Sequence, residues 1–309
     1  MSSWKVIKGK GGDWPEEILL ANSAGYCFGV KCAVNTAYEL AETVDKPVMF
    51  GELIHNKSVI HDLKDKGFQL AETIEDIPEN SKVLIRAHGI PPQVKETIEQ
   101  AGHTVIDQTC PFVLKIHRIV KKAAEEGKHI FLAGKEKHPE ILGIVGVAEQ
   151  IKPGIVTVIG NVEEAKKIPK QPGPAILLAQ TTFAKQEFEQ IKQILSKQIA
   201  LIDCFDTICS ATEDRQAETL ELASVSDLVL VIGGRHSSNT RRLCELAQRK
   251  CGETYLIEDA EDFEALRETV NFSVRCLGVT AGASTPNSII MEVIRRMSET
   301  KQGLNEGEE

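Results

Sequence analysis

The 309-residue sequence has no excess of positive charge and no long hydrophobic run. Lys and Arg number 36 against 45 Asp and Glu, which gives a net charge of −9. Nucleic-acid binding requires clustered basic side chains that neutralise phosphates, so we do not expect a nucleic-acid partner. No apolar stretch approaches the roughly 20 residues that span a bilayer, and the N-terminal segment lacks the apolar core of a signal peptide. We therefore expect a cytoplasmic protein with no membrane partner.

Cysteine is too scarce for a disulfide framework, and its spacing excludes two common motifs. The eight cysteines include no CxxC pair, so neither a zinc ribbon nor a thioredoxin-type site is predicted. A reducing cytosol would keep these residues as thiols, available for metal or redox chemistry. Any cysteine ligands must therefore come from distant parts of the chain.

Sequence motifs for nucleotide cofactors are also missing. The Gly-rich segment GKGGDW near the start of the chain has no preceding strand and no following helical pattern, so it is a poor candidate for a phosphate loop. No Walker sequence or dinucleotide fingerprint occurs elsewhere. Nothing in the chain is therefore expected to bind a nicotinamide or a flavin.

Short apolar runs alternate with longer stretches of helical period along the chain. This alternation is typical of βα units and parallel sheets, so we predict an α/β fold. A globular chain of this length usually divides into two or three domains. The predicted strands are Ile18 to Ala21, Val83 to Arg86, Thr104 to Asp107, His129 to Ala133, Ala175 to Ala179, Ala200 to Asp203, Asp227 to Ile232 and Arg275 to Val279.

A separation of 28 residues recurs three times between a cysteine and a polar residue. The pairs are Cys27 with His55, Cys110 with His138, and Cys209 with Ser237. Each member of each pair follows a predicted strand and precedes a predicted helix. A further strand in each third ends near one polar residue, which is in turn His88, Thr181 and Ser284. The sequence therefore predicts three divergent copies of one α/β unit of about 90 residues.

The expected divisions follow from this repeat. They are a polar N-terminal extension at residues 1–15, α/β repeats at 16–103, 104–199 and 200–297, and a polar C-terminal tail at 298–309. We assign no function to the extension, and we expect the tail to be a frayed terminus.

Three equivalent cysteines suggest a metal centre. The carboxyl ends of parallel strands host ligands, so a threefold arrangement of the repeats would bring Cys27, Cys110 and Cys209 to one point. Two centres fit three thiolates: a three-cysteine zinc site, or a cubane iron-sulfur cluster in which one iron lacks a protein ligand. An iron with an open position can act as a Lewis acid toward a substrate oxygen.

The other residues at repeat positions are donors with little fixed positive charge. This set suits an anion such as a diphosphate, held by imidazoles, hydroxyls, an amide and helix N-termini. Its members are His55, His88, His138, Thr181, Ser237, Ser238, Asn239 and Ser284, with Glu140 two residues beyond His138.

These residues lie in segments that resemble the 4-hydroxy-3-methylbut-2-enyl diphosphate reductases of the methylerythritol phosphate route to isoprenoids. The matching segments run from about residue 18 to 290, and their joint occurrence in this order is highly specific. They are ANSAGYCFGV, ELIHNKSV, RAHGIPP, DQTCPFVLKIH, AGKEKHPEILG, LAQTT, TICSATEDRQ, GGRHSSNTRRL and VTAGAST.

The resemblance implies a fold of three pseudo-repeated α/β domains with parallel-type sheets, arranged as a trefoil around a central 4Fe-4S cluster. Cys27, Cys110 and Cys209 would bind the cluster, and the substrate hydroxyl would bind its fourth iron. Two electrons and two protons would then expel that hydroxyl as water, giving isopentenyl and dimethylallyl diphosphate. The electrons would come from an external protein such as ferredoxin or flavodoxin.

The resemblance also implies roles for the remaining residues. Glu140 with Thr181 would handle protons near the substrate hydroxyl. The alternative for Glu140 is a helix N-terminal glutamate that only complements the helix dipole. The diphosphate would be held by His55, His88, His138, Ser237, Ser238, Asn239 and Ser284.

Two other functions are weighed against this one. Quinolinate synthase is also built from three α/β repeats around a three-cysteine cluster, but the HSSN and KHPE segments argue against it. A non-enzymatic iron-sulfur sensor would need a DNA-binding helix and a basic face, which this acidic chain lacks.

Four further cysteines are expected to be small buried apolar residues, namely Cys32, Cys244, Cys251 and Cys276.

Overall fold

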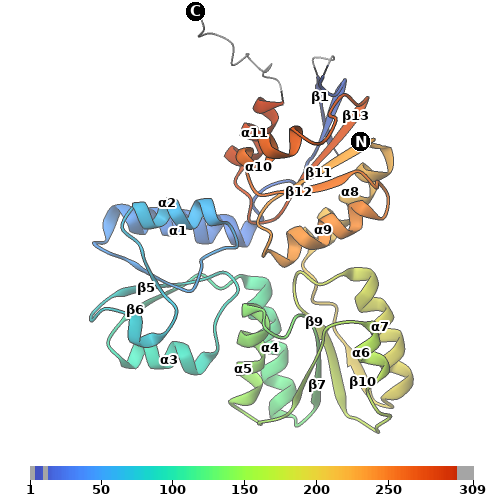
Figure 1. Cartoon of the computed structure of the whole chain (residues 1–309). Coiled ribbons are helices and arrows are strands. Elements are labelled where there is room, and N and C mark those ends of the chain that lie inside the picture. The colour runs from blue at the N-terminus through green and yellow to red at the C-terminus, as the bar shows by residue number, and fades with distance from the viewer. Residues whose placement is uncertain (1–3, 10–12, 298–309) are drawn as a thin grey trace, which may run out of the picture. The chain divides into compact units, whose positions relative to one another are not determined.

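Strands and helices alternate along the chain in the computed structural model, which describes residues 4–9 and 13–297 (Figure 1). All the strand pairs found among these residues are parallel except β1 with β2. This confirms the predicted α/β class with parallel sheets. The predicted tail, 298–309, lies outside the described residues.

The strands are β1 (Trp4–Lys8), β2 (Glu17–Ala21), β3 (Val48–Phe50), β4 (Gln69–Ala71), β5 (Lys82–Ile85), β6 (Thr104–Asp107), β7 (His129–Ala133), β8 (Val156–Ile159), β9 (Ala175–Ala179), β10 (Ile202–Cys204), β11 (Leu228–Ile232), β12 (Thr254–Ile257) and β13 (Cys276–Ala281). The helices are α1 (Phe28–Thr43), α2 (Lys57–Asp65), the 3-10 turn η1 (Ile74–Asp76), α3 (Pro92–Gln100), α4 (Pro111–Glu125), α5 (Pro139–Glu149), α6 (Val162–Lys166), α7 (Lys185–Gln198), α8 (Ser210–Val225), α9 (Ser238–Gln248), α10 (Ala260–Arg267) and α11 (Asn287–Arg296).

The chain divides into two compact units. The first consists of Met1–Tyr26 and Asp214–Glu309, and the second of Cys27–Glu213. The first unit holds a five-stranded sheet in the order β1-β2-β13-β11-β12. Alternate residues of β11 face opposite sides of this sheet, because Leu230 packs in one core with Phe263 of α10 while Val231 packs in another with Leu243 of α9.

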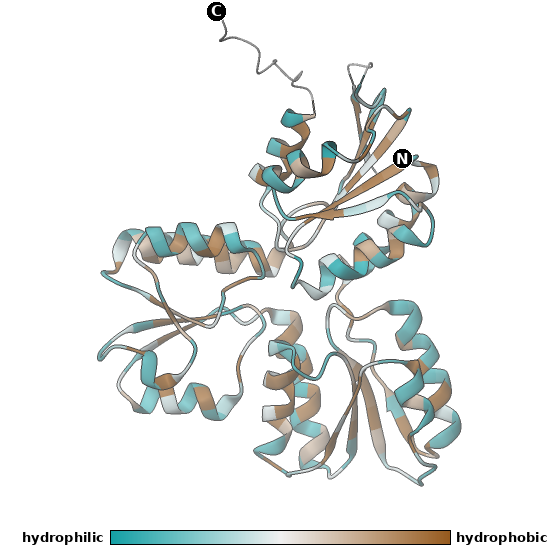
Figure 2. Cartoon of the chain, viewed as in Figure 1, coloured by the Kyte–Doolittle hydropathy of each residue, from teal (hydrophilic) through white to brown (hydrophobic). Residues whose placement is uncertain are grey.

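The second unit holds two four-stranded parallel sheets, ordered β4-β3-β5-β6 and β10-β9-β7-β8. The second of these is covered by helices on both faces. Leu132 of β7 packs with Ile144 of α5 on one side, and Phe131 packs with Phe188 of α7 on the other. Figure 2 shows the apolar strands β7 and β9 beside helices α6 and α7, which are largely hydrophilic.

The sheets do not coincide with the predicted repeats. The first strand of each repeat pairs with a strand that belongs to a different repeat. β2 was assigned to residues 16–103 but pairs with β13. In the same way β6 pairs with β5, and β10 pairs with β9. Helices α3 and α7 supply the crossovers that place β6 and β10 beside the preceding strands, as parallel pairing requires. The spacing of motifs along a chain is the same whichever sheet receives a strand, so the periodicity could not reveal this shift.

The N-terminal stretch is more than a polar extension in its described part. Trp4–Lys8 form the edge strand β1, antiparallel to β2, and the Trp14 side chain is buried in the core beside Ile18. No helix among the described residues is long and apolar enough to cross a membrane.

Proline fixes the start of two helices directly after predicted site residues. Pro111 occupies the first turn of α4 after Cys110, and Pro139 that of α5 after His138. Proline is favoured there because its fixed φ suits the helix and its missing N–H would have no intrahelical partner. Cys110 and His138 are thereby held at helix N-termini.

Candidate functional site

The three predicted metal-binding cysteines all precede helices of the second unit or its boundary. Cys27 and Cys110 are the N-caps of α1 and α4, and Cys209 immediately precedes α8. All three are free thiols and partly buried. The positive end of a helix dipole stabilises a thiolate, so this position favours metal binding by sulfur.

The three sulfur atoms lie close enough to influence one another's ionisation. Burial raises the pKa of the Cys110 thiol, and the charges of Cys27 and Cys209 raise it further. Burial also raises the pKa of Cys209, with added contributions from Cys27 and Glu140. Thiols such as Cys110 and Cys209, whose ionisation is opposed by burial and by neighbouring thiols, are stabilised as thiolates by a bound cationic centre.

Gly29, in the first turn of α1, allows this close approach. A Cβ atom built on Gly29 would lie 2.7 Å from the Sγ atom of Cys110, a distance that real Cβ atoms do not tolerate. Helix α1 therefore approaches Cys110 through a residue without a side chain. Cys27 and Cys110 are brought together in this way although 83 residues separate them in the sequence, from position 27 to 110.

Three predicted histidines form a cluster in the same unit. The ring centroids of His55 and His88 are 4.8 Å apart and stacked, and His138 meets them edge-on at 5.7 and 5.2 Å. One nitrogen from each ring lies within 4.8 Å of the others. Neutral imidazoles at this spacing can donate hydrogen bonds to one anion or bind one metal ion.

The chain around the histidines sets their proton positions. His138 caps α5, and its Nδ1 atom accepts a hydrogen bond from the Glu140 backbone N–H at 3.2 Å. The neutral ring therefore carries its proton on Nε2, where it can donate to a ligand. Burial lowers the pKa of His88 well below its usual value, and the charges of His55, His138 and Arg86 lower it further.

Arg86 was not anticipated by the sequence analysis, which described an anion pocket with little fixed positive charge. It begins the RAH segment, two residues before His88, and its guanidinium is close enough to lower the His88 pKa. Burial lowers the pKa of Arg86 itself, and the charges of Glu72 and Glu52 partly oppose this lowering. The only signal in the sequence was the adjacency of Arg86 to the predicted ligand His88.

Glu140 is fully buried on the first turn of α5 and bound at both carboxyl oxygens by Thr181. The Thr181 backbone N–H donates to Oε1 at 2.7 Å, and its hydroxyl donates to Oε2 at 2.8 Å. Burial raises the pKa of Glu140 to about 7, although both of these hydrogen bonds oppose the rise. A carboxyl group with this pKa is suited to proton donation near neutral pH.

Thr181 also connects this carboxyl group to the cysteines. Its backbone carbonyl accepts a hydrogen bond from the N–H of Cys209 at 3.1 Å. A continuous chain of contacts therefore runs from Glu140 through Thr181 to Cys209. Helix-dipole complementarity alone does not require a fully buried glutamate tied to a residue 41 positions away, so the geometry favours the chemical interpretation over the capping one.

The remaining predicted residues, Ser237, Ser238, Asn239 and Ser284, lie in the first unit. Ser237 caps α9, and its side chain accepts a hydrogen bond from the Thr240 N–H at 3.3 Å. Ser284 follows β13, whose neighbour β11 leads to α9. Because these strands are parallel, the loops after them lie at the same edge of the sheet.

Several polar atoms at this edge are buried without a partner in the described part of the chain. They are the Ser238 hydroxyl, the Asn239 amide nitrogen and the Thr240 hydroxyl. Buried polar groups are normally hydrogen-bonded, so an unpaired set of donors indicates a polar ligand. Thr240 was missed from the sequence, although it directly continues the SSN run.

The other five cysteines differ from this group. Cys32 is exposed and Cys244 is partly exposed, so the expectation that they are buried is wrong, whereas Cys251 and Cys276 are buried as predicted. Cys204 ends β10 rather than following it, and it packs against an apolar core.

Comparisons with known proteins show the family of the chain. The sequence profile of the LytB protein family matches residues 18–298. The 4-hydroxy-3-methylbut-2-enyl diphosphate reductase of Nitratiruptor sp. is 41% identical over 282 residues, which is 91% of this chain and 98% of that protein. The enzyme of the same name from Thermoanaerobacter sp. (strain X514) is 38% identical over 285 residues, 91% of this chain and 96% of the relative.

Solved structures give the same result. A structure of (E)-4-hydroxy-3-methyl-but-2-enyl diphosphate reductase, described as the terminal enzyme of the non-mevalonate pathway, aligns with a TM-score of 0.66 at 35% identity, over 92% of this chain and 99% of that one. The Plasmodium falciparum E-1-hydroxy-2-methyl-but-2-enyl-4-diphosphate reductase aligns with a TM-score of 0.83 at 26% identity, over 92% and 88%. These matches do not support a quinolinate synthase or an iron-sulfur sensor. The chain belongs to the LytB protein family.

Proposed function

We propose that this chain reduces 4-hydroxy-3-methylbut-2-enyl diphosphate to isopentenyl and dimethylallyl diphosphate. Relatives with this activity in their names match at least 90% of its length. The observation that carries the proposal is the hydrogen-bonded series from Glu140 through Thr181 to the backbone N–H of Cys209, because it ties a buried carboxyl group to the backbone of a cysteine at a candidate metal centre.

Cys27, Cys110 and Cys209 would hold one 4Fe-4S cluster. The donor set fits this group: three free thiols lie at or beside helix N-termini, and Cys27 is close enough to raise the pKa of both Cys110 and Cys209. When bound, the cluster supplies single electrons and an iron that can accept a substrate oxygen. The second candidate, a three-cysteine zinc site, would offer no redox chemistry.

The diphosphate would be bound without direct contact from a basic side chain. His55, His88 and His138 offer ring N–H donors on one side, and we assign the donors of the first unit to the same anion. These are Ser237, Ser238, Asn239 and Ser284, at the edge where buried polar atoms lack partners in the part of the chain described. Preorganised neutral donors and helix N-termini bind phosphate groups well.

Glu140 would donate the proton that leaves with the hydroxyl group. Carbon–oxygen cleavage without a proton would release hydroxide, a much poorer leaving group than water. Thr181 would hold the carboxyl group by its N–H and hydroxyl, so that its proton points toward the substrate. The overall change consumes two electrons and two protons and releases one water molecule.

Both electrons would come from an external protein such as a ferredoxin or flavodoxin, since no nucleotide-binding motif was found in the sequence. We also propose that three repeats each contribute one cysteine to the site. The protein would be cytoplasmic and would have no nucleic-acid partner.

Anaerobic purification followed by spectroscopy and turnover tests the function. The reduced protein should give an electron paramagnetic resonance signal of an iron-sulfur cluster, and viologen reduced with dithionite should support conversion of the allylic diphosphate to both products. Zinc in place of iron, or a full cluster with no conversion of this substrate, would contradict the proposal.

A further inference from the structure

A groove runs along α4 in the second unit, outside the site described above. It has a volume of about 750 Å³ and is formed between helices α3, α4 and α5. Its lining residues are Pro92, Glu96, Pro111, Leu114, His117, Arg118, Lys121, Val147, Gln150 and Ile151. The mechanism proposed above uses none of them.

The α4 side of this groove is basic and partly apolar. Arg118 and Lys121 line the groove, and Lys115 is exposed three residues before Arg118 on the same helix. None of the three forms an ion pair with another described residue. Leu114 and Ile151 remain 41% and 37% exposed beside them. An exposed apolar strip bordered by unpaired charges of one sign is typical of a site for a protein of opposite charge.

One acidic residue, Glu96, also lines the groove, and its carboxylate accepts a hydrogen bond from the Gln150 side-chain amide at 3.3 Å. The third lysine of α4, Lys122, lies 3.8 Å from Glu126. The local excess of positive charge contrasts with the net charge of −9 for the whole chain. An acidic protein would therefore be repelled by most of this molecule and attracted to this face.

The groove also reaches the candidate metal centre. Pro111, at one end of it, directly follows Cys110. The next residue, Phe112, is 42% exposed. This end of the groove is therefore the part of it nearest to Cys110 along the chain.

We propose that this groove docks a small acidic protein that carries single electrons. The inference rests on the proposed function, because it presumes a cluster on Cys110. In each encounter the reduced carrier loses one electron and the cluster gains it, so two encounters supply the two electrons that the reaction consumes. The basic side chains hold and orient the carrier, and Leu114 and Ile151 supply the apolar contact.

Charge reversal tests the proposal on the cluster-loaded protein. The triple variant Lys115→Glu, Arg118→Glu, Lys121→Glu should bind an acidic bacterial ferredoxin at least roughly tenfold more weakly at low salt than the unaltered chain. Affinity is measured by calorimetry with the oxidised ferredoxin, so the readout does not depend on turnover. The affinity of the unaltered chain should fall steeply with ionic strength, and that of the variant should not.

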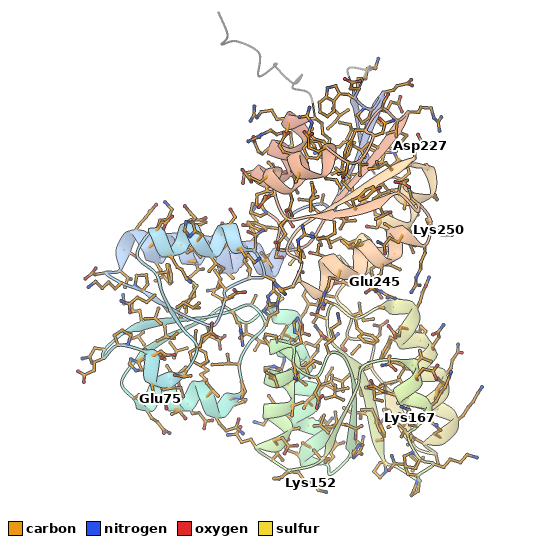
Figure 3. All side chains as sticks on the ribbon, in the orientation of Figure 1. Glu75, Lys152, Lys167, Asp227, Glu245 and Lys250 are labelled. Carbon is orange, nitrogen blue, oxygen red and sulfur yellow. The ribbon has the colours of Figure 1, made fainter. Side chains whose placement is uncertain are left out.

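A matched control carries the same change of charge elsewhere in this unit. Lys64, Lys167 and Lys197 are exposed on or beside α2, α6 and α7, and Lys167 lies at the outer end of α6 (Figure 3). The variant Lys64→Glu, Lys167→Glu, Lys197→Glu should keep nearly the full affinity for ferredoxin. An equal loss of ferredoxin affinity in both variants would show that net charge alone causes the effect. That result would overturn the proposal that the groove is the docking site.

Turnover with reduced viologen separates this inference from the proposed function. The groove variant should keep viologen-driven turnover while ferredoxin-driven turnover falls at least tenfold. Unchanged ferredoxin binding with normal viologen turnover would overturn the docking site and leave the function intact. No viologen turnover in the unaltered chain would instead refute the function. Dimers of the unaltered chain that the groove variant abolishes would assign the groove to a second copy and overturn the proposal.

Discussion

Thr181 donates two hydrogen bonds to Glu140, one to each carboxyl oxygen, from its backbone N–H and its hydroxyl. The two residues that the resemblance pairs for proton handling are therefore in direct contact. Thr181 therefore orients the carboxyl group, and the lone pairs and proton that remain on Glu140 are left for a ligand.

The first prediction concerns proton donation. Glu140→Gln keeps the size and hydrogen-bonding capacity of the side chain but cannot donate an acidic proton. Viologen-driven turnover should fall roughly a hundredfold or more, with iron content and pyrophosphate binding retained. Near-normal turnover in this variant would assign Glu140 to a structural role at the start of α5.

The pH dependence of turnover should follow the same carboxyl group. Its pKa of about 7 means that the donating form predominates below pH 7 and is lost as the pH rises. The rate of the unaltered enzyme with saturating reductant should decline above about pH 7. The residual rate of Glu140→Gln should lack this decline, and a decline shared by both proteins would point to a different acid.

Stability should also depend on Glu140. Its pKa is raised from 4.5 to about 7 in the folded protein, so the folded state binds the proton more tightly than the unfolded state. The stability contributed by the neutral form is fully present below pH 4.5 and is lost as the pH rises through 7, a change of about 3 kcal/mol at most. Urea unfolding of the cluster-free protein between pH 5 and pH 8 should show this loss, and Glu140→Gln should show less of it.

The cysteine assignments can be tested one by one. Cys27→Ser, Cys110→Ser and Cys209→Ser should each lose iron and activity, because the remaining thiols cannot complete the ligand set. Cys204→Ala is the control, since Cys204 packs into an apolar core five residues from Cys209 along the chain, from position 204 to 209. Iron content and the visible spectrum decide the outcome, and iron loss equal to that of Cys209→Ser would show that Cys204 belongs to the site.

The approach of α1 to Cys110 gives a further test. Gly29→Ala would place a Cβ atom 2.7 Å from the Cys110 sulfur, so cluster content should fall severalfold while the protein stays folded. Gly252→Ala is the matched control, because a Cβ atom there meets nothing within 4 Å. Full iron content in Gly29→Ala would mean that the two segments can move apart without cost to the site.

Much of the local structure could be predicted from the sequence. Thr104–Asp107, His129–Ala133 and Ala175–Ala179 are strands with the predicted bounds, because compact apolar runs end there at polar residues. Pairing between strands could not be predicted, since a repeat of motifs gives no information on which sheet receives each strand. The edge strand Trp4–Lys8 was missed because its short run of three apolar residues lies in a stretch that is polar and Gly-rich as a whole.

The site shows the same division. Regular spacing predicted that His55 and His138 occupy equivalent loops, and the structure brings both into one cluster with His88. The contact of Thr181 with Glu140 depends on how α5 packs beside β9, and the effect of Arg86 on His88 depends on burial. Packing between segments that are distant in the sequence decides both the contact and the pKa effect. The spacing of motifs does not predict that packing.

The exchange of strands between sheets has a consequence for folding. Each sheet is completed by a strand from a neighbouring third of the chain, as β6 completes the sheet of β5 and β10 that of β9. A fragment cut at the boundary of one sequence repeat would lose an edge strand and expose unpaired N–H and C=O groups, which favours aggregation. No third of this protein is therefore an autonomous folding unit, and the native pairings must wait for contacts that are distant in the sequence.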